Sequence, residues 1–226
     1  MDIKHNYIDT GSGKTLILLH GNNDNLEYFH QQIEAFSPFY RVVALDTRGH
    51  GKTPRGNAPF TLVQFAEDLF VFMKCLHIKK AHILGFSDGA NIAIAFALKY
   101  PRLIDKLILD GGNIFPEGID RETQQPIEDA YYEAMEYAFE DAEARAKAEM
   151  LGLMVNEPHY FPQDLQAITA QTLVMAGDHD LILPEHTQLI HDSIPGSQLA
   201  IIPGSHFVAA ENPDEYNAAV LSFLQD

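Results

Sequence analysis

Short apolar runs alternate with longer amphipathic segments along most of the chain. Most of the short runs are apolar throughout, which is typical of strands buried on both faces of a parallel sheet. The longer segments repeat their apolar positions at helical spacing, as Leu62, Phe65, Ala66 and Leu69 do. The pattern predicts strands over 4–8, 15–20, 41–46, 81–86, 106–110, 172–176 and 198–202, and helices over 26–36, 62–76, 88–100, 184–194 and 213–224. This alternation predicts an α/β fold with a mostly parallel, doubly wound sheet of about eight strands.

The alternation stops between residues 113 and 166. This stretch contains no clear buried strand, and residues 127–154 are helix-prone and rich in Ala, Glu, Met and Tyr. Because the stretch leaves from the end of a predicted strand, we interpret 113–166 as an inserted helical cap over a core of 1–112 and 167–226. The alternative is an ordinary pair of helices that pack on the sheet.

The composition argues against a disulfide-stabilised, membrane-spanning or nucleic-acid-binding protein. The 226 residues suffice for one hydrophobic core and a small insertion. The formal net charge of −17 disfavours nucleic acid and anionic membranes as partners. Cys75 is the single cysteine, so no internal disulfide can form, and no apolar run reaches membrane-spanning length. We therefore expect a cytoplasmic protein without nucleic-acid or membrane partners; its oligomeric state stays open.

The sequence Gly85-Phe86-Ser87-Asp88-Gly89 joins a predicted strand directly to a predicted helix. The spacing is that of a nucleophile elbow, a sharp turn that lifts a serine hydroxyl above the edge of the sheet. Glycines flank the serine because larger side chains would clash in so tight a turn. The helix N-terminus that follows favours a developing negative charge. Ser87 is therefore the candidate nucleophile.

A serine hydroxyl needs a base within hydrogen-bond reach, and the base needs an acid that orients it. Two later predicted strands end in loops that carry such residues. Asp178 and Asp180 follow the strand 172–176, and His206 follows the strand 198–202. Because parallel strands end at one edge of the sheet, these side chains and Ser87 are expected to meet there.

Five short motifs together resemble the α/β-hydrolase superfamily, in its serine hydrolase branch. They are His20-Gly21, residues 46–51, residues 85–89, residues 177–180 and residues 204–206. The resemblance implies the chain order serine, acid, histidine, and its acid-loop pattern favours Asp180 over Asp178, which would then be a turn residue. A serine nucleophile argues against the branches similar to haloalkane dehalogenases and epoxide hydrolases, which use aspartate there.

The elbow is similar to the Gly-Trp-Ser-Asp-Gly elbow of valacyclovir hydrolase-like esterases. That resemblance implies that Asp88 meets the amino group of a cationic acyl group. The alternative is that Asp88 only stabilises the dipole of the helix that it begins.

An oxyanion formed during acyl transfer needs two preset donors. The backbone amide of Asp88 is one, and the amide of Asn22, in the loop after the strand 15–20, is the predicted second, with Asn23 as the fallback. His20 is expected to brace this loop. Arg48, in residues 46–51, is expected to tie down neighbouring carbonyls, and the glycines there to take positive φ.

Apolar side chains of the cap and beside the histidine are candidates for substrate contact, although some are expected to be cap core. With Asn23 and Asp88, they are Phe115, Tyr131, Tyr132, Met135, Phe139 and Phe207. No metal or organic cofactor is implied. The histidines show no zinc-type spacing such as His-Glu-x-x-His.

These residues predict a carboxylesterase that cleaves small esters, with lactones and amino-acid esters included, through Ser87, His206 and Asp180. One alternative is hydrolysis of a carbon–carbon bond or a thioester by the same three residues. An alternative of another class is a non-catalytic, ligand-binding receptor that keeps the fold, against which the complete set of three residues weighs.

Overall fold

The computed structural model describes residues 2–225, and over this range seven strands form a single sheet. Their order is β1-β3-β2-β4-β5-β6-β7; β1 pairs antiparallel with β3, and the other neighbouring pairs are parallel. The predicted α/β fold is confirmed, with seven strands where about eight were expected. The strands are β1 Tyr7–Thr10, β2 Thr15–Leu19, β3 Arg41–Leu45, β4 Ala81–Phe86, β5 Ile104–Asp110, β6 Gln171–His179 and β7 Gln198–Ser205.

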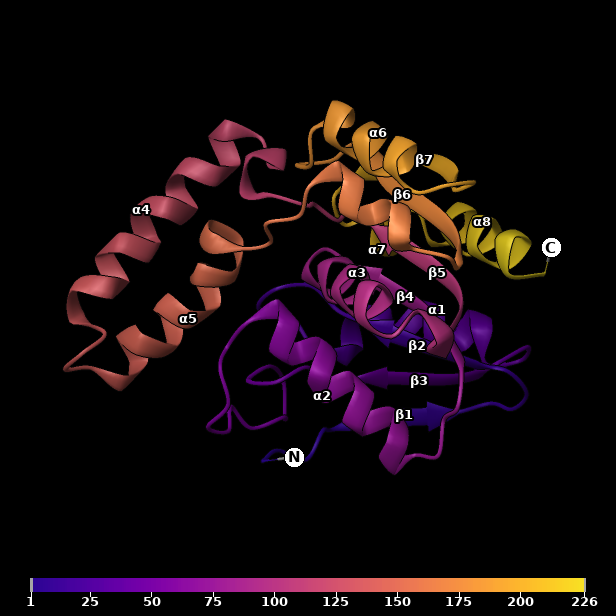
Figure 1. Cartoon of the computed structure of the whole chain (residues 1–226), viewed down its shortest axis with the longest axis horizontal. Helices are drawn as coiled ribbons and strands as arrows, with labels where there is room; N and C mark the ends of the chain where they lie inside the picture. Colours follow the sequence, from indigo (N-terminus) through magenta and orange to yellow (C-terminus); the bar gives the residue numbers. More distant parts are fainter. Residues whose placement is uncertain (1, 226) are drawn as a thin grey trace.

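Helices cover both faces of the sheet (Figure 1). One apolar core lies between the sheet and α2, α3 and α6, and a second lies between the sheet and α1, α7 and α8. The interior strands of the sheet, from β3 to β6, are mostly buried on both sides, which explains why their sequences are largely apolar. The helices are α1 His30–Phe36, α2 Leu62–Cys75, α3 Asp88–Lys99, α4 Arg121–Tyr137, α5 Ala142–Asn156, α6 Pro184–Ser193, α7 Val208–Glu211 and α8 Pro213–Gln225.

The last two strands are longer than the apolar runs predicted. β6 continues to His179 and β7 to Ser205, beyond 172–176 and 198–202. A register shift between Gly177 and His179 keeps them paired to their ends. Gly177 permits this close approach, because a β-carbon there would lie 2.2 Å from the carbonyl oxygen of Ser205. The first strand begins at Tyr7 rather than at residue 4.

Helices α4 and α5 pack against each other and project beyond the edge of the sheet at which the parallel strands end (Figure 1). The helix-prone stretch 127–154 is therefore two helices, with α4 beginning earlier, at Arg121. Asp120 caps α4 by accepting from the N–H of Thr123, and Asp141 caps α5 by accepting from the N–H groups of Glu143 and Ala144. The division into core and cap at 113 and 166 stays a prediction.

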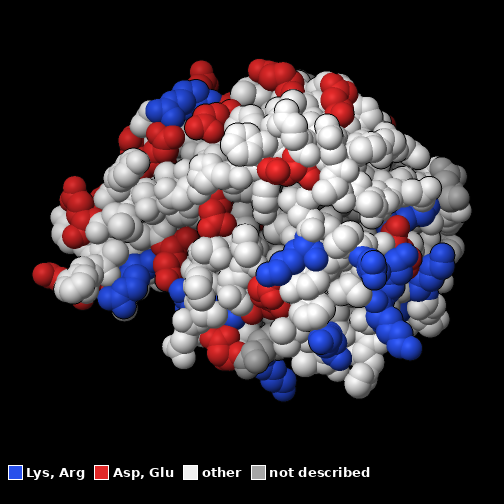
Figure 2. Space-filling model, viewed as in Figure 1, with Lys and Arg blue, Asp and Glu red and all other residues white. Residues whose placement is uncertain are grey.

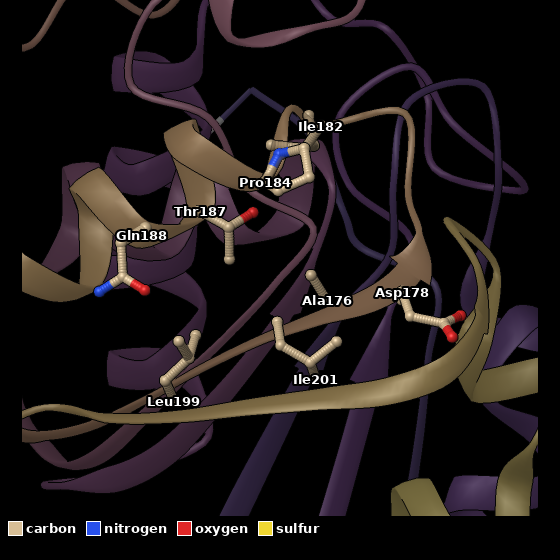
Figure 3. A pocket seen from close by; sticks show the side chains of 9 residues that line it. Ala176, Asp178, Ile182, Pro184, Thr187, Gln188, Leu199 and Ile201 are labelled. Carbon is tan, nitrogen blue, oxygen red and sulfur yellow. The ribbon is translucent and has the colours of Figure 1, made fainter.

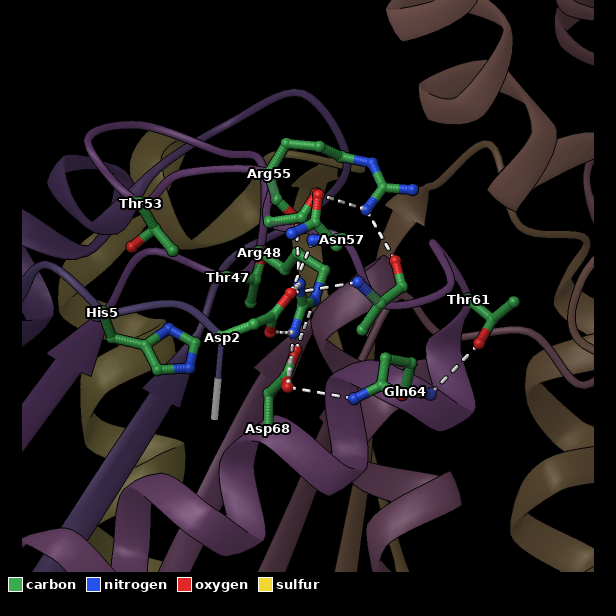
Figure 4. Close-up of polar contacts among 12 residues, drawn as sticks. Asp2, His5, Thr47, Arg48, Thr53, Arg55, Asn57, Thr61, Gln64 and Asp68 are labelled. Carbon is green, nitrogen blue, oxygen red and sulfur yellow. Dashed lines mark hydrogen bonds and ion pairs between the residues drawn. The ribbon is translucent and has the colours of Figure 1, made fainter.

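A buried arginine organises the loop after β3 (Figure 4). The guanidinium of Arg48 is fully buried and donates to Asp68 at 2.7 and 2.8 Å and to Asp2 at 2.8 and 3.1 Å. Arg48 was expected to bind neighbouring carbonyls. It binds one of them, the carbonyl of Arg55, and its other partners are the two carboxylates. Gly49 and Gly51 have the predicted positive φ, at 73° and 52°.

Charge is distributed unevenly over the molecule (Figure 2). Residues 113–166 contain 13 acidic and 3 basic side chains. Basic side chains gather at the opposite end, where the parallel strands begin; among them are Lys14, Arg41, Lys80 and Lys106. In residues 2–225, no helix combines the length and the apolar character needed to cross a bilayer.

Candidate active site

Ser87 occupies the turn between β4 and α3 with φ 54° and ψ −122°, a conformation that is strained for a residue with a side chain. Its N–H donates to the carbonyl of Asp110 on β5 at 2.8 Å, which anchors the turn to the neighbouring strand. A β-carbon on Gly85 would lie 2.2 Å from the carbonyl oxygen of Gly89, and one on Gly89 would lie 2.0 Å from that of Leu19. Both positions therefore require glycine, because the backbone approaches too closely for any side chain.

His206 lies between Ser87 and Asp180 in one line of hydrogen bonds. Its Nε2 is 3.0 Å from Ser87 Oγ, and its Nδ1 is 2.6 Å from Asp180 Oδ1. Asp180 Oδ1 also accepts from the N–H of Ile182 at 2.9 Å, which fixes the carboxylate. The imidazole and the carboxylate are almost fully buried, with 7% and 2% of their side chains exposed. This arrangement can move the serine proton to the imidazole while the carboxylate stabilises the imidazolium.

Asp178 lies in a different environment from Asp180. Its Oδ1 accepts from the N–H of Gly204 at 2.9 Å and lies 2.7 Å from Nδ1 of the exposed His179. These contacts tie the ends of β6 and β7 together, and none of them reaches His206. The structure therefore gives Asp178 a role in holding the strand ends.

The loop after β2 lies directly against the nucleophile turn. A β-carbon on Gly21 would come within 3.1 Å of the β-carbon of Ser87, so the following residue, Asn22, is next to the serine. The N–H of Asp88 is the first of α3 and has no carbonyl partner within the helix. Both segments thus lie beside Ser87, and the assignment of the amides of Asn22 and Asp88 to an oxyanion hole stays a prediction.

His20 braces this loop, as its position in the sequence suggested. Its Nδ1 lies 2.7 Å from the carbonyl of Gly21, and its Nε2 accepts from the N–H of Thr47 at 3.0 Å. Burial lowers the pKa of His20 to about 4, so the ring is neutral and carries its proton on Nδ1. The loop is therefore fastened to the segment after β3.

The carboxyl group of Asp88 is buried next to the nucleophile. Its Oδ2 accepts from Asn22 Nδ2 at 2.7 Å, and its Oδ1 accepts from Asn91 Nδ2 at 3.4 Å. Burial raises the pKa of Asp88 to about 6, while the two amides lower it. The side chain of Asp88 is therefore engaged within the protein rather than open to solvent.

The other candidates for substrate contact fall in separate places. Tyr131 and Met135 line a cavity of about 250 Å³ together with Phe60 and Glu157. Phe207 is half exposed, with its ring centre 5.6 Å from that of His206. The remaining candidates are Asn23, Tyr132 and Phe139, which are exposed, and Phe115, whose ring packs on His186 at 4.5 Å.

Glu157 and Asn91 lie near Asp88, and sequence reasoning missed both. Glu157 accepts from the N–H of Leu62 at 2.8 Å, and its charge contributes to the raised pKa of Asp88. Because Glu157 is far from Asp88 in the sequence, no local pattern could have joined those two residues. Asn91 did carry a signal, since an asparagine within an alanine-rich helix interior is unfavourable without a partner.

A further cavity of about 220 Å³ lies between β6, β7 and α6 (Figure 3). Its lining is mostly apolar and contains neither Ser87 nor His206; it includes Ala176, Leu199 and Ile201. It therefore lies beside the loop of Asp180 and apart from Ser87 and His206. Among residues 2–225, no group of three or more histidine, cysteine or acidic side chains could hold a metal ion.

Known proteins and solved structures match this chain over almost its whole length, and a family model matches more than half of it. A family model described as alpha/beta hydrolase fold matches residues 14–154. The human serine hydrolase BPHL is 28% identical over 249 residues, covering 99% of this chain and 84% of that protein. A thermophilic esterase from Thermogutta terrifontis has a TM-score of 0.83 at 25% identity, covering 99% of this chain and 93% of the esterase. The meta-cleavage product hydrolase CumD from Pseudomonas fluorescens IP01 has a TM-score of 0.80 at 26% identity, covering 99% and 94% of the two chains.

Proposed function

The chain belongs to the alpha/beta hydrolase fold family, and on this basis we propose that it is a serine hydrolase that cleaves small carboxylic esters. The observation that carries the proposal is the line of hydrogen bonds from Ser87 through His206 to Asp180. The similarity to the serine hydrolase BPHL and to the esterase from Thermogutta terrifontis supports the same chemistry. The single cysteine, Cys75, supports work in a reducing compartment such as the cytoplasm.

The reaction proceeds through an acyl-enzyme. His206 Nε2 takes the proton of Ser87 as the serine oxygen bonds to the ester carbonyl carbon, and the amides of Asn22 and Asp88 hold the oxyanion. His206 then gives that proton to the alcohol oxygen as the ester C–O bond breaks. A water molecule that His206 deprotonates attacks the acyl-enzyme, and His206 then returns that proton to Ser87 Oγ as the bond between Oγ and the acyl carbon breaks, which releases the carboxylic acid.

The charges around the site favour neutral or cationic esters over anionic ones. Residues 113–166, which project at the active edge, carry ten more acidic than basic side chains. Such a field attracts cations and repels anions before they reach the serine. Glu157, in the cavity lined by Tyr131 and Met135, adds negative charge that acts on Asp88 beside Ser87.

A fluorophosphonate probe followed by a substrate panel tests the proposal. Wild type and the control Ser222→Ala, a surface serine on α8, should be labelled, and Ser87→Ala should not be. The panel contains p-nitrophenyl esters of neutral, ammonium-bearing and carboxylate-bearing acids, together with a lactone, a thioester and a vinylogous diketone. We expect turnover of the neutral and cationic esters, with kcat/KM for the anionic ester lower by about tenfold or more.

Two results would contradict the proposal. Folded wild type that is not labelled would indicate a binding protein rather than a hydrolase. Labelled protein that turns over the thioester or the diketone but none of the oxygen esters would keep the mechanism and reject the substrate class.

A further inference from the structure

Asp88 stands where three parts of the molecule meet. It directly follows Ser87 and begins α3. Through Asn22 Nδ2, at 2.7 Å, it holds the loop after β2, whose backbone amide is the proposed oxyanion donor. Its carboxylate is therefore linked both to the nucleophile turn and to the loop opposite.

The same amide of Asn22 reaches helix α5. Its Nδ2 also donates to the carbonyl oxygen of Met150, at 2.9 Å. One amide group thus uses its two hydrogens on two acceptors, the Asp88 carboxylate and a backbone carbonyl in the region 113–166. The carbonyl of Met150 lies in the interior of α5, so this bond locates the helix rather than caps its end.

The second oxygen of Asp88 leads to the beginning of that region. Asp88 Oδ1 accepts from Asn91 Nδ2, which also donates to Asn113 Oδ1 at 2.8 Å. Asn91 Oδ1 accepts in return from the N–H of Asn113 at 2.9 Å. The side chain of Asn113 donates to the carbonyl of Phe115, at 2.9 Å. The chain of bonds therefore runs from the start of residues 113–166 to their second helix, and Asp88 is at its centre.

The role inferred for this network rests on the proposed function. We propose that Asp88 is a positioning residue, which holds the oxyanion loop and helix α5 in place against the nucleophile turn. When α5 lies against the core, Asn22 bridges Met150 and Asp88, and its backbone amide is fixed beside Ser87. When α5 moves away, that amide loses one of its anchors.

This role for Asp88 differs from direct binding of a positively charged group on the substrate. Each oxygen of Asp88 already accepts from a side-chain amide, so a substrate ammonium group would have to displace one of them. Of the titratable groups near Asp88, Glu157 raises the pKa of its carboxyl group and His206 lowers it. Because the amides are donors, the network needs the ionised carboxylate, whereas burial favours the neutral form.

The test replaces Asp88 by Asn, which keeps the shape but turns one acceptor into a donor that opposes an amide. Amide hydrogen exchange is measured on wild type, on Asp88→Asn and on Asp214→Asn, which removes a first-turn acid from α8 as a control. We expect faster exchange in residues 20–23 and in α5 for Asp88→Asn alone, with β5 and α8 unchanged. Exchange that is unaltered in α5, or raised equally in all elements, would overturn the proposal.

Kinetics on two matched esters separate positioning from charge recognition. The pair is the benzyl ester of valine, which is cationic, and the benzyl ester of 3-methylbutanoate, its neutral counterpart. Asp88→Asn should lower kcat about tenfold to a hundredfold on both, by loss of geometry, with KM changed less than about threefold. A loss confined to the cationic ester would assign Asp88 to substrate binding and reject the positioning role.

A reversed pair tests the bond itself. In Asn22→Asp/Asp88→Asn the amide and the carboxylate change places, so the link between the loop and the nucleophile turn can form again while the link to Met150 cannot. Exchange in residues 20–23 should return toward wild type, and exchange in α5 should stay fast. If amide exchange stayed fast in both segments, the hydrogen bond between Asn22 and Asp88 would not be what holds the loop in place. Absence of fluorophosphonate labelling in wild type would reject the proposed function alone, because the exchange measurements need no turnover.

Discussion

Gly111 lies against the imidazole ring of His206. Replacing it by alanine is therefore a sensitive test of where that ring must lie for activity. It follows β5 with φ 57°, in the left-handed region that favours glycine. A β-carbon at this position would lie 2.8 Å from His206 Cε1 and 2.9 Å from His206 Nδ1. Since carbon atoms pack at about 3.5–4.0 Å, the ring would have to move by roughly 0.7–1.2 Å.

The expected losses follow from these distances. The left-handed conformation costs a non-glycine residue about 1–2 kcal/mol, and forcing a methyl group into a packed site costs about 1–3 kcal/mol more. A displacement near 1 Å at a reacting group lowers the rate about a hundredfold. Gly111→Ala should therefore fold with reduced stability and lose about a hundredfold in kcat/KM.

Gly196 offers a matched control. It has φ 72°, and a β-carbon there would meet nothing within 4 Å. Gly196→Ala should lose only the roughly 1–2 kcal/mol of conformational strain and keep wild-type turnover. Urea denaturation gives the free energy of unfolding, and ester turnover gives the rate. If Gly111→Ala and Gly196→Ala showed equal kcat/KM, the contact with His206 would have no functional meaning.

Three further predictions concern charged groups. Asp180→Asn should lower kcat about ten-thousandfold through loss of the imidazole partner, whereas Asp178→Asn should stay within about threefold in the same assay. Burial raises the pKa of Asp110 well above its usual value, so wild-type stability should fall as the pH rises above about 4, by at most about 1.4 kcal/mol per unit. That fall should be smaller in Asp110→Asn, as followed by urea denaturation at several pH values. Arg48→Met should cost about 3–5 kcal/mol of unfolding free energy by leaving Asp68 buried and unpaired, and adding Asp68→Leu should recover most of it. Unchanged stability in the single variant would show that the buried pair contributes nothing.

The sequence predicts best where local chemistry and spacing agree. The strands β2 to β5 are apolar because both faces are covered, and their ends carry Ser87 and the His20 loop. The elbow needs glycine at 85 and 89 for contact distance, so its pattern identifies the turn without any knowledge of the fold. Asp180 and His206 could be placed because each lies in the loop after a predicted strand, and the family resemblance favoured Asp180 over Asp178.

Contacts that depend on the path of the chain could not be predicted. Asn22 donates to the backbone carbonyl of Met150. Because any residue at position 150 would supply that carbonyl, the sequence contains no signal for the contact. The extra length of β6 and β7 arises because they pair with each other, and their last residues are polar and resemble a loop. The break between α4 and α5 lies at 138–141, where Asp141 was readable as a helix cap only once the two helices were separate.

The separation of charge between the two ends of the molecule has a practical consequence for attaching it to a solid support. A cationic resin would adsorb the acidic end that contains residues 113–166, and the edge of the sheet that carries Ser87 would then face the bead. An anionic support would capture the opposite end, where the parallel strands begin near Lys14 and Lys106, and leave the serine toward the solution. The specific activity of the immobilised protein should therefore depend on the sign of the support, being higher on the anionic one at equal loading.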